Sequence, residues 1–150
     1  MHVKLIEVSK DDASARAELV AFVNAHYPSE LPVTDDSFAY TVFFWAVAAD
    51  DKSRARVGCT GYVAKTAFLA ESVKTVIDPS FRGKGAGVAV SQAIEDEVRR
   101  RGFKKIMTTI LIGNLPMIFI KLKQGFIVEG IHMDHEKPGL HEYSLGKVLR

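Results

Sequence analysis

The sequence has one cysteine, Cys59, and no long apolar run. A single cysteine cannot form a disulfide within the chain, which favours a reducing compartment, and we expect a cytoplasmic protein. The longest apolar run, residues 42–49, has eight residues, whereas a helix needs about 20 to cross a membrane. The stretch after Met1 also lacks the apolar segment of a signal peptide. The sequence therefore predicts no association with a membrane.

Strong charge of one sign is also absent, because 20 Lys and Arg stand against 18 Asp and Glu, a net charge of +2. This balance gives no reason to expect nucleic acid as a partner. With 47% hydrophobic and 25% charged residues, the composition is that of a globular protein rather than a disordered one. No repeat or linker divides the chain, so we expect a single domain over residues 1–150.

Apolar periodicity, caps and turn residues predict a chain of strands interrupted by helices. Strands are expected at residues 3–8, 41–49, 56–64, 68–77, 105–112, 126–133 and 141–149, and helices at about 9–25, 86–101 and 114–124. Ser9 is the expected N-cap of the first helix, with Asp11 and Asp12 in its first turn. Residues 26–36 are expected to form a loop with room for a short helix. This order predicts an α+β fold, with antiparallel strands first and a βαβ unit in the second half.

The segment that indicates a function joins the strand ending at Ile77 to the helix beginning near Ala86. It reads VIDPSFRGKGAG at residues 76–87, with three glycines in five residues. Glycines let the backbone come close to a ligand and adopt positive φ at little cost. The first amides of a helix have no internal partners and carry the positive end of its dipole. Together with Arg82 and Lys84, these amides predict a binding site for a diphosphate.

Two nucleotide-binding motifs do not match this loop. A P-loop requires Gly, then Lys, then Ser or Thr, but Lys84 precedes Gly85 and no Ser or Thr follows. The dinucleotide fingerprint G-x-G-x-x-G would begin at Gly83 and end at Val88, which is not glycine. Another kind of diphosphate ligand is therefore expected.

The loop resembles the acyl-CoA loop of the GCN5-related N-acetyltransferase (GNAT) family. The family signature is Gln or Arg, two residues, Gly, one residue, and Gly or Ala, and it is matched by RGKGAG at residues 82–87 after the lead-in IDP at 77–79. A second family block, an Asn followed by a Gly-Phe pair, is matched by Asn114 and Gly125-Phe126. The resemblance implies a mixed, mostly antiparallel sheet of six to seven strands, flanked by about four helices, in which one parallel pair of strands splays apart.

The resemblance also implies acetyl-CoA as the acyl donor and assigns residues to its binding. Loop amides would hold the pyrophosphate, at Arg82, Gly83, Lys84, Gly85, Ala86, Gly87 and Val88. The pantetheine arm would pair with the end of the preceding strand, at Thr75, Val76 and Ile77, and Asn114 would contact the arm. The thioester would enter a gap between residues 75–77 and 108–110, where a backbone amide near Ile77 would stabilise the oxyanion.

Glu71 is the candidate general base, because its position resembles that of the catalytic glutamate in histone-type members of the family. An amine with a pKa of about 10 is mostly protonated at neutral pH, so a base assists its attack. Glu71 lies six residues before Ile77 in the sequence, so both side chains are expected on one face of the strand. The alternative, given equal weight, is a solvent-facing glutamate near the start of a strand.

The usual acid of the family is absent. Many members have Tyr four residues before the glycine of Gly125-Phe126, but Lys121 is found there. Lys121 is a candidate proton donor to the leaving thiolate, and the alternative, which is favoured, is a solvated lysine on an amphipathic helix. Tyr143 is a second candidate acid, although its alternation with Leu145 also fits a position in the core.

The acceptor is expected to be a primary amine on a small molecule or peptide. In the family, the segment after the first helix and the last hairpin line the acceptor side, which here are residues 27–36 and 132–141. Acidic residues there favour a basic acceptor: Glu30, Asp35, Asp36, Asp134 and Glu136. His132, His135 and His141 lack the spacing of a zinc motif, so they are interpreted as polar rim residues and no metal is expected.

These features predict an N-acetyltransferase that works by direct attack in a ternary complex, because no credible Cys or Ser nucleophile is present. The alternative is a module that binds acyl-CoA with little or no transfer, which the absent Tyr favours. A third interpretation, a small nucleotide-binding regulator, predicts that ATP or NAD binds as well as CoA. We expect a monomer, or a homodimer through exposed strand edges of the last hairpin.

Overall fold

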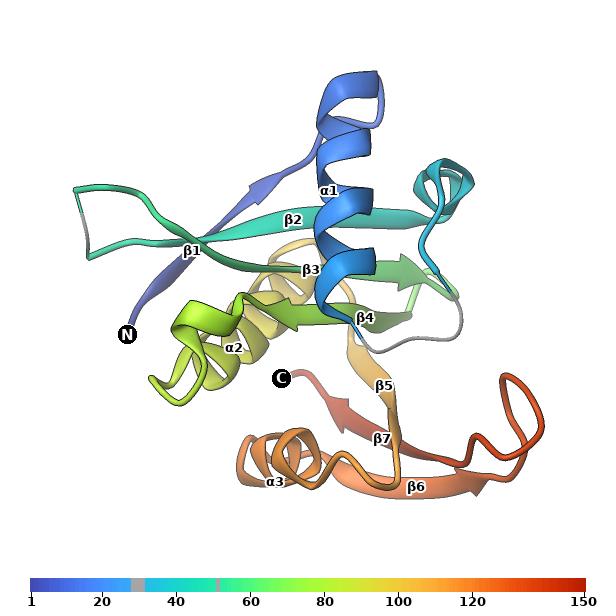
Figure 1. Ribbon diagram of the computed structural model, residues 1–150. Helices are drawn as coiled ribbons and strands as arrows, with labels where there is room; N and C mark the ends of the chain where they lie inside the picture. Colours follow the sequence, from blue (N-terminus) through green and yellow to red (C-terminus); the bar gives the residue numbers. More distant parts are fainter. Residues whose placement is uncertain (28–31, 51) are drawn as a thin grey trace.

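The computed structural model describes residues 1–27, 32–50 and 52–150. Its elements follow the order β1 (Val3–Glu7), α1 (Ala13–His26), the 3₁₀ helix η1 (Asp35–Ala39), β2 (Thr41–Ala48), β3 (Arg56–Ala64), β4 (Leu69–Ile77), the 3₁₀ helix η2 (Pro79–Phe81), α2 (Ala86–Arg100), β5 (Lys105–Leu111), α3 (Leu115–Lys123), β6 (Ile127–His132) and β7 (Glu142–Val148) (Figure 1). Every expected strand and helix is present, with ends that differ by a few residues.

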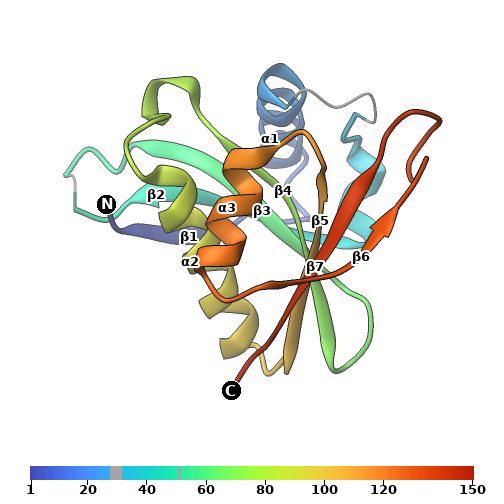
Figure 2. The same ribbon diagram turned by 90° about the horizontal axis from the view of Figure 1, so that it is seen from below.

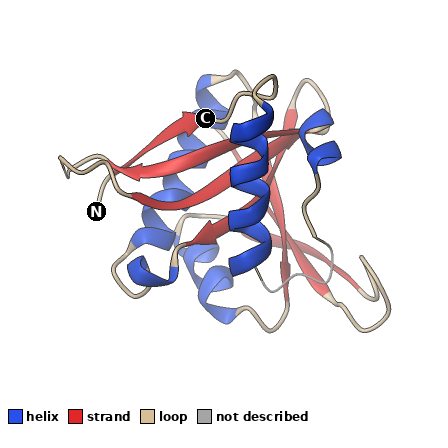
Figure 3. Ribbon diagram, turned by 45° about the horizontal axis from the view of Figure 1, so that its top comes forward, coloured by secondary structure: helices blue, strands red, loops and turns tan. Residues whose placement is uncertain are grey.

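The seven strands form one sheet in the order β1-β2-β3-β4-β5-β7-β6. All neighbours are antiparallel except β4 and β5, which are parallel. Helix α1 covers one face of the sheet, and α2 and α3 lie on the other (Figures 1, 2 and 3). We call these the α1 face and the α2–α3 face. The predicted α+β sheet is confirmed, with three α-helices and two 3₁₀ helices in the described residues where about four helices were expected.

The first helix begins later than predicted. Asp12, not Ser9, is the N-cap, because the Asp12 side chain accepts a hydrogen bond from the Ala15 backbone N–H at 3.0 Å. The Ser9 hydroxyl instead accepts from the Asp11 N–H at 3.3 Å, within the preceding turn. Both side chains are good caps, and the sequence pattern alone did not decide between them. Among the described residues, no helix is long and apolar enough to cross a membrane.

Two apolar layers hold the helices on the sheet. On the α1 face, Leu19 and Val23 are almost fully buried in one cluster with Val76 of β4. On the other face, α2 places Val90, Ile94 and Val98 one helical turn apart, and all three are fully buried. Strand β4 lies at the middle of the sheet and contributes to both layers, so its conformation fixes how the two faces relate.

The sheet opens between β4 and β5. These strands are paired only at their starts, where Leu69 faces Lys105, Ala70 faces Ile106 and Glu71 faces Met107. Beyond that point the strands diverge, while β5 stays paired with β7 along its whole length (Figure 1). The Thr108 hydroxyl donates to the Ser72 carbonyl at 3.1 Å just after the last pair. The expected splayed parallel pair is confirmed.

Candidate functional site

Three glycines shape the loop between β4 and α2, for two different reasons. Gly83 and Gly85 have φ of +73° and +80°, a region that residues with side chains rarely adopt. A Cβ at either position would meet nothing within 4 Å, so only the backbone conformation requires glycine there. Gly87 is a packing glycine, because its Cβ would lie 3.3 Å from the Ile120 side chain of α3. The loop thus turns sharply and brings α2 close to α3.

The loop leaves the first backbone amides of α2 without a side-chain cap, although the Ala86 residue itself is buried. Gly85 is the N-cap of α2 and gives no side-chain cap to the first amides of the helix, including those of Ala86, Gly87 and Val88. Lys84 is exposed beside them. The Arg82 side chain is directed elsewhere, because its guanidinium donates to the Ile77 carbonyl at 3.3 Å and to the His26 carbonyl at 3.5 Å. Arg82 therefore ties the loop to the ends of β4 and α1, and Lys84 is the nearer cation for an anion on the loop.

An apolar groove of about 390 Å³ lies beside the loop, between α2 and α3. It is lined by Val88, Pro116, Phe119, Ile120, Lys123 and Gln124. Val88 and Phe119 are 51% and 57% exposed, which is high for apolar side chains. The sequence analysis did not single out the α3 residues, although exposed apolar positions on a short amphipathic helix were a signal. A glycine loop with an uncapped helix N-terminus next to an apolar groove suits a ligand that carries both phosphates and an apolar arm.

A bulge interrupts β4 at Lys74. Cys59 of β3 faces Val76, but Gly61 faces Val73, so β4 has one residue more than β3 in this interval. Lys74 has φ of +51°, which is uncommon for a residue with a side chain. On the far side of the bulge, a Cβ on Gly58 would lie 2.1 Å from the Val76 carbonyl oxygen, so β3 must have glycine there.

The bulge overturns one expectation about β4. In the pairing with β3, Glu71 lies opposite Val63 and Ile77 lies opposite Gly58. Val63 and Gly58 point to opposite faces of the sheet. Ile77 packs on the α2–α3 face with Val90, whereas Glu71 lies on the α1 face. The prediction that Glu71 and Ile77 share a face is therefore wrong, because the extra residue reverses the alternation of side chains.

Glu71 lies where β4 and β5 are still paired, opposite Met107. Its carboxylate forms an ion pair with Lys65 at 3.1 Å, and its side chain is 16% exposed. Glu71 is thus partly buried and paired with a half-exposed lysine, so both the base and the solvent-facing alternative stay predictions. The open part of the gap begins one residue further along, and Thr75 and Ile77 line it from the α2–α3 face.

Lys121 is buried beneath α3, with 3% exposure. Its Nζ lies 4.7 Å from the centre of the Phe126 ring, and no hydrogen-bond partner for it is found in the described part of the chain. The pKa of Lys121 is lowered to about 8, mainly by burial. The charge of Glu95 raises this pKa, and the charge of Lys147 lowers it further. The alternative of a solvated lysine is wrong, because this amine has lost its water without gaining a direct partner.

The other two predicted residues near α3 are also placed. Asn114 is the N-cap of α3, since its side-chain oxygen accepts from the Met117 N–H at 3.4 Å. Tyr143 lies opposite Ile110 on β7 and packs, partly buried, against the core of the α2–α3 face. Lys121 and Tyr143 are therefore on one face of the sheet, and Glu71 is on the other.

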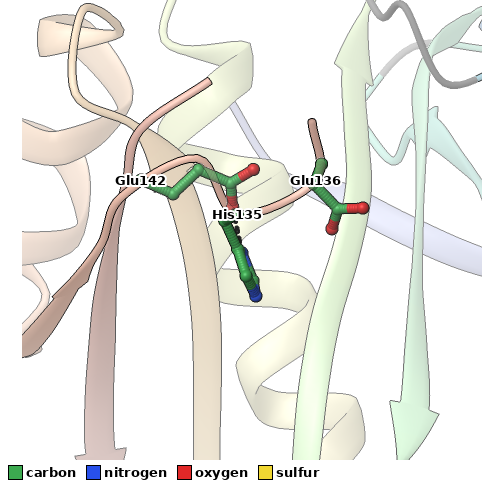
Figure 4. A group of neighbouring side chains, drawn as sticks. All are labelled: His135, Glu136 and Glu142. Carbon is green, nitrogen blue, oxygen red and sulfur yellow. Dashed lines mark ion pairs between the residues drawn. The ribbon is translucent and has the colours of Figure 1, made fainter. Parts of the chain in front are cut away.

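A second group of polar side chains gathers on the α1 face, near the wide end of the gap. We call it the mixed-charge cluster: Tyr27, Lys74, His135, Glu136 and Glu142. The His135 Nδ1 lies 3.5 Å from a Glu142 carboxylate oxygen, and one ligand atom from each of His135, Glu136 and Glu142 lies within 4.8 Å of the others (Figure 4). The Lys74 Nζ lies 4.8 Å from the centre of the Tyr27 ring.

The groups in the mixed-charge cluster influence one another. Burial raises the pKa of Tyr27, and the charges of Glu142 and Glu136 raise it further. Burial lowers the pKa of Lys74, and the same two carboxylates oppose that shift. The sequence analysis named Tyr27, His135 and Glu136 as lining this side but missed Lys74 and Glu142, which lie in strands. A lysine between Val73 and Thr75, near the middle of a predicted strand, was the available signal for Lys74.

Most of the other acidic residues expected on this side are engaged or fall elsewhere. Asp35 accepts from Arg16 at 2.6 Å, and Asp134 accepts from the Gly139 N–H at 2.7 Å. Asp36 is exposed on η1. Glu30 falls outside the described residues. Of the four acidic residues that the structure describes, Glu136 is the one that joins the mixed-charge cluster. His132 stacks on His135, with ring centres 4.4 Å apart.

The sequence and the fold were compared with known proteins. The model of the acetyltransferase (GNAT) family matches residues 12–126. No curated protein matches the sequence. Among solved structures, the chain is similar to a GNAT family acetyltransferase from Elizabethkingia anophelis with acetyl-CoA bound, at 12% identity and a TM-score of 0.77, with 99% of each chain covered.

Two further structures give the same result. One is a Bacillus subtilis acetyltransferase in complex with CoA, at 16% identity and a TM-score of 0.74, with 99% of each chain covered. The other is a mutant spermidine/spermine N-acetyltransferase from Vibrio cholerae, at 15% identity and a TM-score of 0.74, which covers 98% of this chain and 94% of that one. At these identities the likeness establishes the fold alone.

Proposed function

Because the chain belongs to the acetyltransferase (GNAT) family, we propose that it transfers an acetyl group from acetyl-CoA to a primary amine by direct attack in a ternary complex. The observation that carries the proposal is the opening of the sheet between β4 and β5, directly before a glycine loop that caps α2. A thioester and a diphosphate can bind to consecutive segments of one strand-loop-helix unit.

The donor site follows from the geometry of this unit. The amides of residues 82–88 and Lys84 would hold the pyrophosphate at the N-terminus of α2. Thr75, Val76 and Ile77 lack a partner on the β5 side, so the pantetheine arm can pair with them as an added strand. Asn114 lies at the start of α3 beside this path, where its side-chain amide would donate to the arm.

A protonated acceptor loses two protons, one before its nitrogen attacks and one from the tetrahedral intermediate, and the leaving thiolate gains one. The amine nitrogen attacks the thioester carbonyl, and a backbone N–H near Ile77 would stabilise the oxyanion. The C–S bond then breaks, and the thiolate takes a proton. Lys121 is the first candidate donor, because a pKa of about 8 is close to that of a thiol. Tyr143, on the same face of the sheet, is the second candidate.

Glu71 is the candidate base that takes the proton from the attacking ammonium. It lies on the α1 face, whereas both candidate acids lie on the α2–α3 face. An acceptor that enters from the α1 face would thus meet the thioester between the base and the acid. The acid must stay protonated while the base is ionised, and the different surroundings of the two groups allow this.

A thermal-shift titration tests the donor site, with acetyl-CoA as ligand and ATP and NAD as controls. At 100 times Kd a specific ligand adds about 2.7 kcal/mol to the free energy of unfolding, a rise of roughly 5 to 10 °C for a chain of this size. Lys84→Glu should weaken the affinity for acetyl-CoA about 10- to 100-fold, through loss of a charge-assisted contact. Lys52→Glu, an exposed change far from the loop, is the matched control. Equal shifts with ATP or NAD would contradict the proposal.

Release of the CoA thiol in the presence of amines separates transfer from binding. An acyl-CoA-binding module, favoured by Lys121 in place of the usual Tyr, would bind acetyl-CoA but release no thiol with any amine. Steady thiol release that depends on the amine concentration would establish the transferase.

A further inference from the structure

We propose that the acceptor is a small α-amino acid, which presents a carboxylate and an amine of opposite charge to the mixed-charge cluster. This inference rests on the proposed function and names the substrate class of the same site. Lys74 would bind the carboxylate of the acceptor, and Glu142 with Glu136 would hold its ammonium group.

Lys74 is the residue that distinguishes this site from a simple acidic pocket. The bulge places its side chain on the α1 face, over the Tyr27 ring, where it is half-buried. Among the described residues, no carboxylate lies within ion-pair distance of its Nζ, and burial lowers its pKa. A half-buried ammonium without an ion-pair partner is costly, and a bound anion would offset that cost.

The opposite charge comes from the last hairpin. Glu142, the first residue of β7, is 7% exposed, and one of its oxygens lies near His135 Nδ1 (Figure 4). Glu136 lies next to His135, and its carboxylate points toward the same space. Both carboxylates act on Lys74 and Tyr27 through their charge, so the two signs lie close together. In an α-amino acid the amine and the carboxylate are also close, separated by one carbon atom.

The cluster lies where an attacking amine is needed. Lys74 directly precedes Thr75, the first residue expected to pair with the pantetheine arm, and Glu142 faces Leu111 at the end of β5. These positions flank the wide end of the gap between β4 and β5 (Figure 1). An ammonium group held by the carboxylates would thus face the thioester from the α1 face, and before attack it would pass a proton through water to Glu71, which lies on the same face nearer the closed end of the gap.

A purely cationic acceptor fits this arrangement less well. A polyamine or a lysine side chain would bring a second positive charge against Lys74, which has no way to move into water without leaving the Tyr27 ring. Of the acidic residues that suggested a basic acceptor, Asp35 pairs with Arg16 and Asp134 accepts from the Gly139 N–H. The structure therefore favours an acceptor that carries its own anion.

Matched pairs of acceptors test the inference with the full chain and saturating acetyl-CoA. Each α-amino acid is compared with its carboxamide and with its decarboxylated amine, such as serine with serinamide and ethanolamine, and spermidine is the polycationic control. For at least one amino acid, kcat/KM should exceed that of its carboxamide about 10- to 100-fold, the value of a charge-assisted hydrogen bond. Preference for carboxamides, decarboxylated amines or spermidine would overturn the inference.

Lys74→Met should remove this preference by raising KM for the amino acid about 10- to 100-fold, while the carboxamide is unaffected or gains. Lys4→Met, an exposed change on β1 at the far edge of the sheet, should leave the ratio unchanged. The ratio of the two acceptors does not depend on how much of the variant is folded, so a partly unfolded Lys74→Met sample still gives a result. An unchanged ratio of kcat/KM between the amino acid and its carboxamide would show that Lys74 does not bind the carboxylate.

The two proposals fail in different ways. If acetyl-CoA does not bind, or no amine releases thiol, the transferase itself is wrong. If amines without a carboxylate release thiol as well as amino acids do, the transferase stands and only the acceptor class is wrong.

Discussion

The two faces of the central strand β4 differ in where their polar and binding residues lie in the sequence. On the side of α2, the proposed donor site is contiguous: residues 75–88 supply the strand end, the glycine loop and the helix N-terminus. On the α1 face, the mixed-charge cluster collects Tyr27, Lys74 and the hairpin residues 135–142 from distant parts of the chain. The proposed donor site could thus be recognised as a sequence motif, whereas the residues of the proposed acceptor site come together only on folding.

The comparison predicts that a change at the shared strand damages both faces, and Gly58→Ala is the strongest case. The added Cβ would lie 2.1 Å from the Val76 carbonyl, where backbone must move. We expect a loss of about 3 kcal/mol in the free energy of unfolding and a fall of roughly 6 to 12 °C in Tm, measured by thermal and urea denaturation. Gly130→Ala, where nothing lies within 4 Å of the new Cβ, is the matched control. Equal stability of the two variants would show that β3 and β4 are not locked at this point.

A change confined to the loop should affect the donor side alone. Gly85→Ala forces a side chain into φ of +80° without a steric clash, at a cost of about 1 to 2 kcal/mol. Because relaxation of the loop misplaces the first amides of α2, the thermal shift caused by acetyl-CoA should also shrink. The ratio of kcat/KM between an amino acid and its carboxamide should stay the same. Gly113→Ala is the control, and a changed ratio in Gly85→Ala would mean that the two sides are coupled.

Much of the fold and half of the site could be predicted from the sequence, for physical reasons that concern particular residues. The periodicity of residues 86–101 and the glycines of the loop are local signals, and both led to the correct structure. The bulge at Lys74 has no such signal, since positive φ is usually marked by glycine or asparagine. The extra residue of this bulge is the reason why the prediction that Glu71 and Ile77 share a face is wrong. The burial of Lys121 and Glu142 depends on how α3 and β7 pack, which no local pattern describes.

Lys121→Met tests two effects of this buried amine, one on the free energy of unfolding and one on kcat. The folded protein holds the pKa of Lys121 at about 8, below its ordinary value, so the unfolded chain binds the proton more tightly. The resulting penalty is fully present below pH 8 and disappears as the pH rises through and beyond that value. Lys121→Met should therefore be more stable than the natural chain by about 1 kcal/mol at pH 7, and the difference should shrink toward pH 10.

The kcat of Lys121→Met tests whether the Lys121 amine, besides its effect on stability, donates a proton in the reaction. If Lys121 protonates the leaving thiolate, Lys121→Met lowers kcat while the affinity for acetyl-CoA and the amino acid preference are kept. If Lys121→Met has a normal kcat, Tyr143 is the proton donor, and Tyr143→Phe should then lower kcat.

The smallest effect on stability is expected on the α1 face, at the ion pair of Lys65 and Glu71. Lys65 is 47% exposed, so Lys65→Gln should change the free energy of unfolding by no more than about 0.5 kcal/mol. Glu71→Gln removes the same ion pair and also the proposed base, so kcat should fall about 100-fold, the usual contribution of a general base, with the largest loss near pH 6, where the amine is most protonated. Measuring kcat for both variants from pH 6 to 9 separates the two effects. Equal kcat in Lys65→Gln and Glu71→Gln would mean that Glu71 serves only to pair with Lys65, and the base would then have to be sought among His135 and the carboxylates of the mixed-charge cluster.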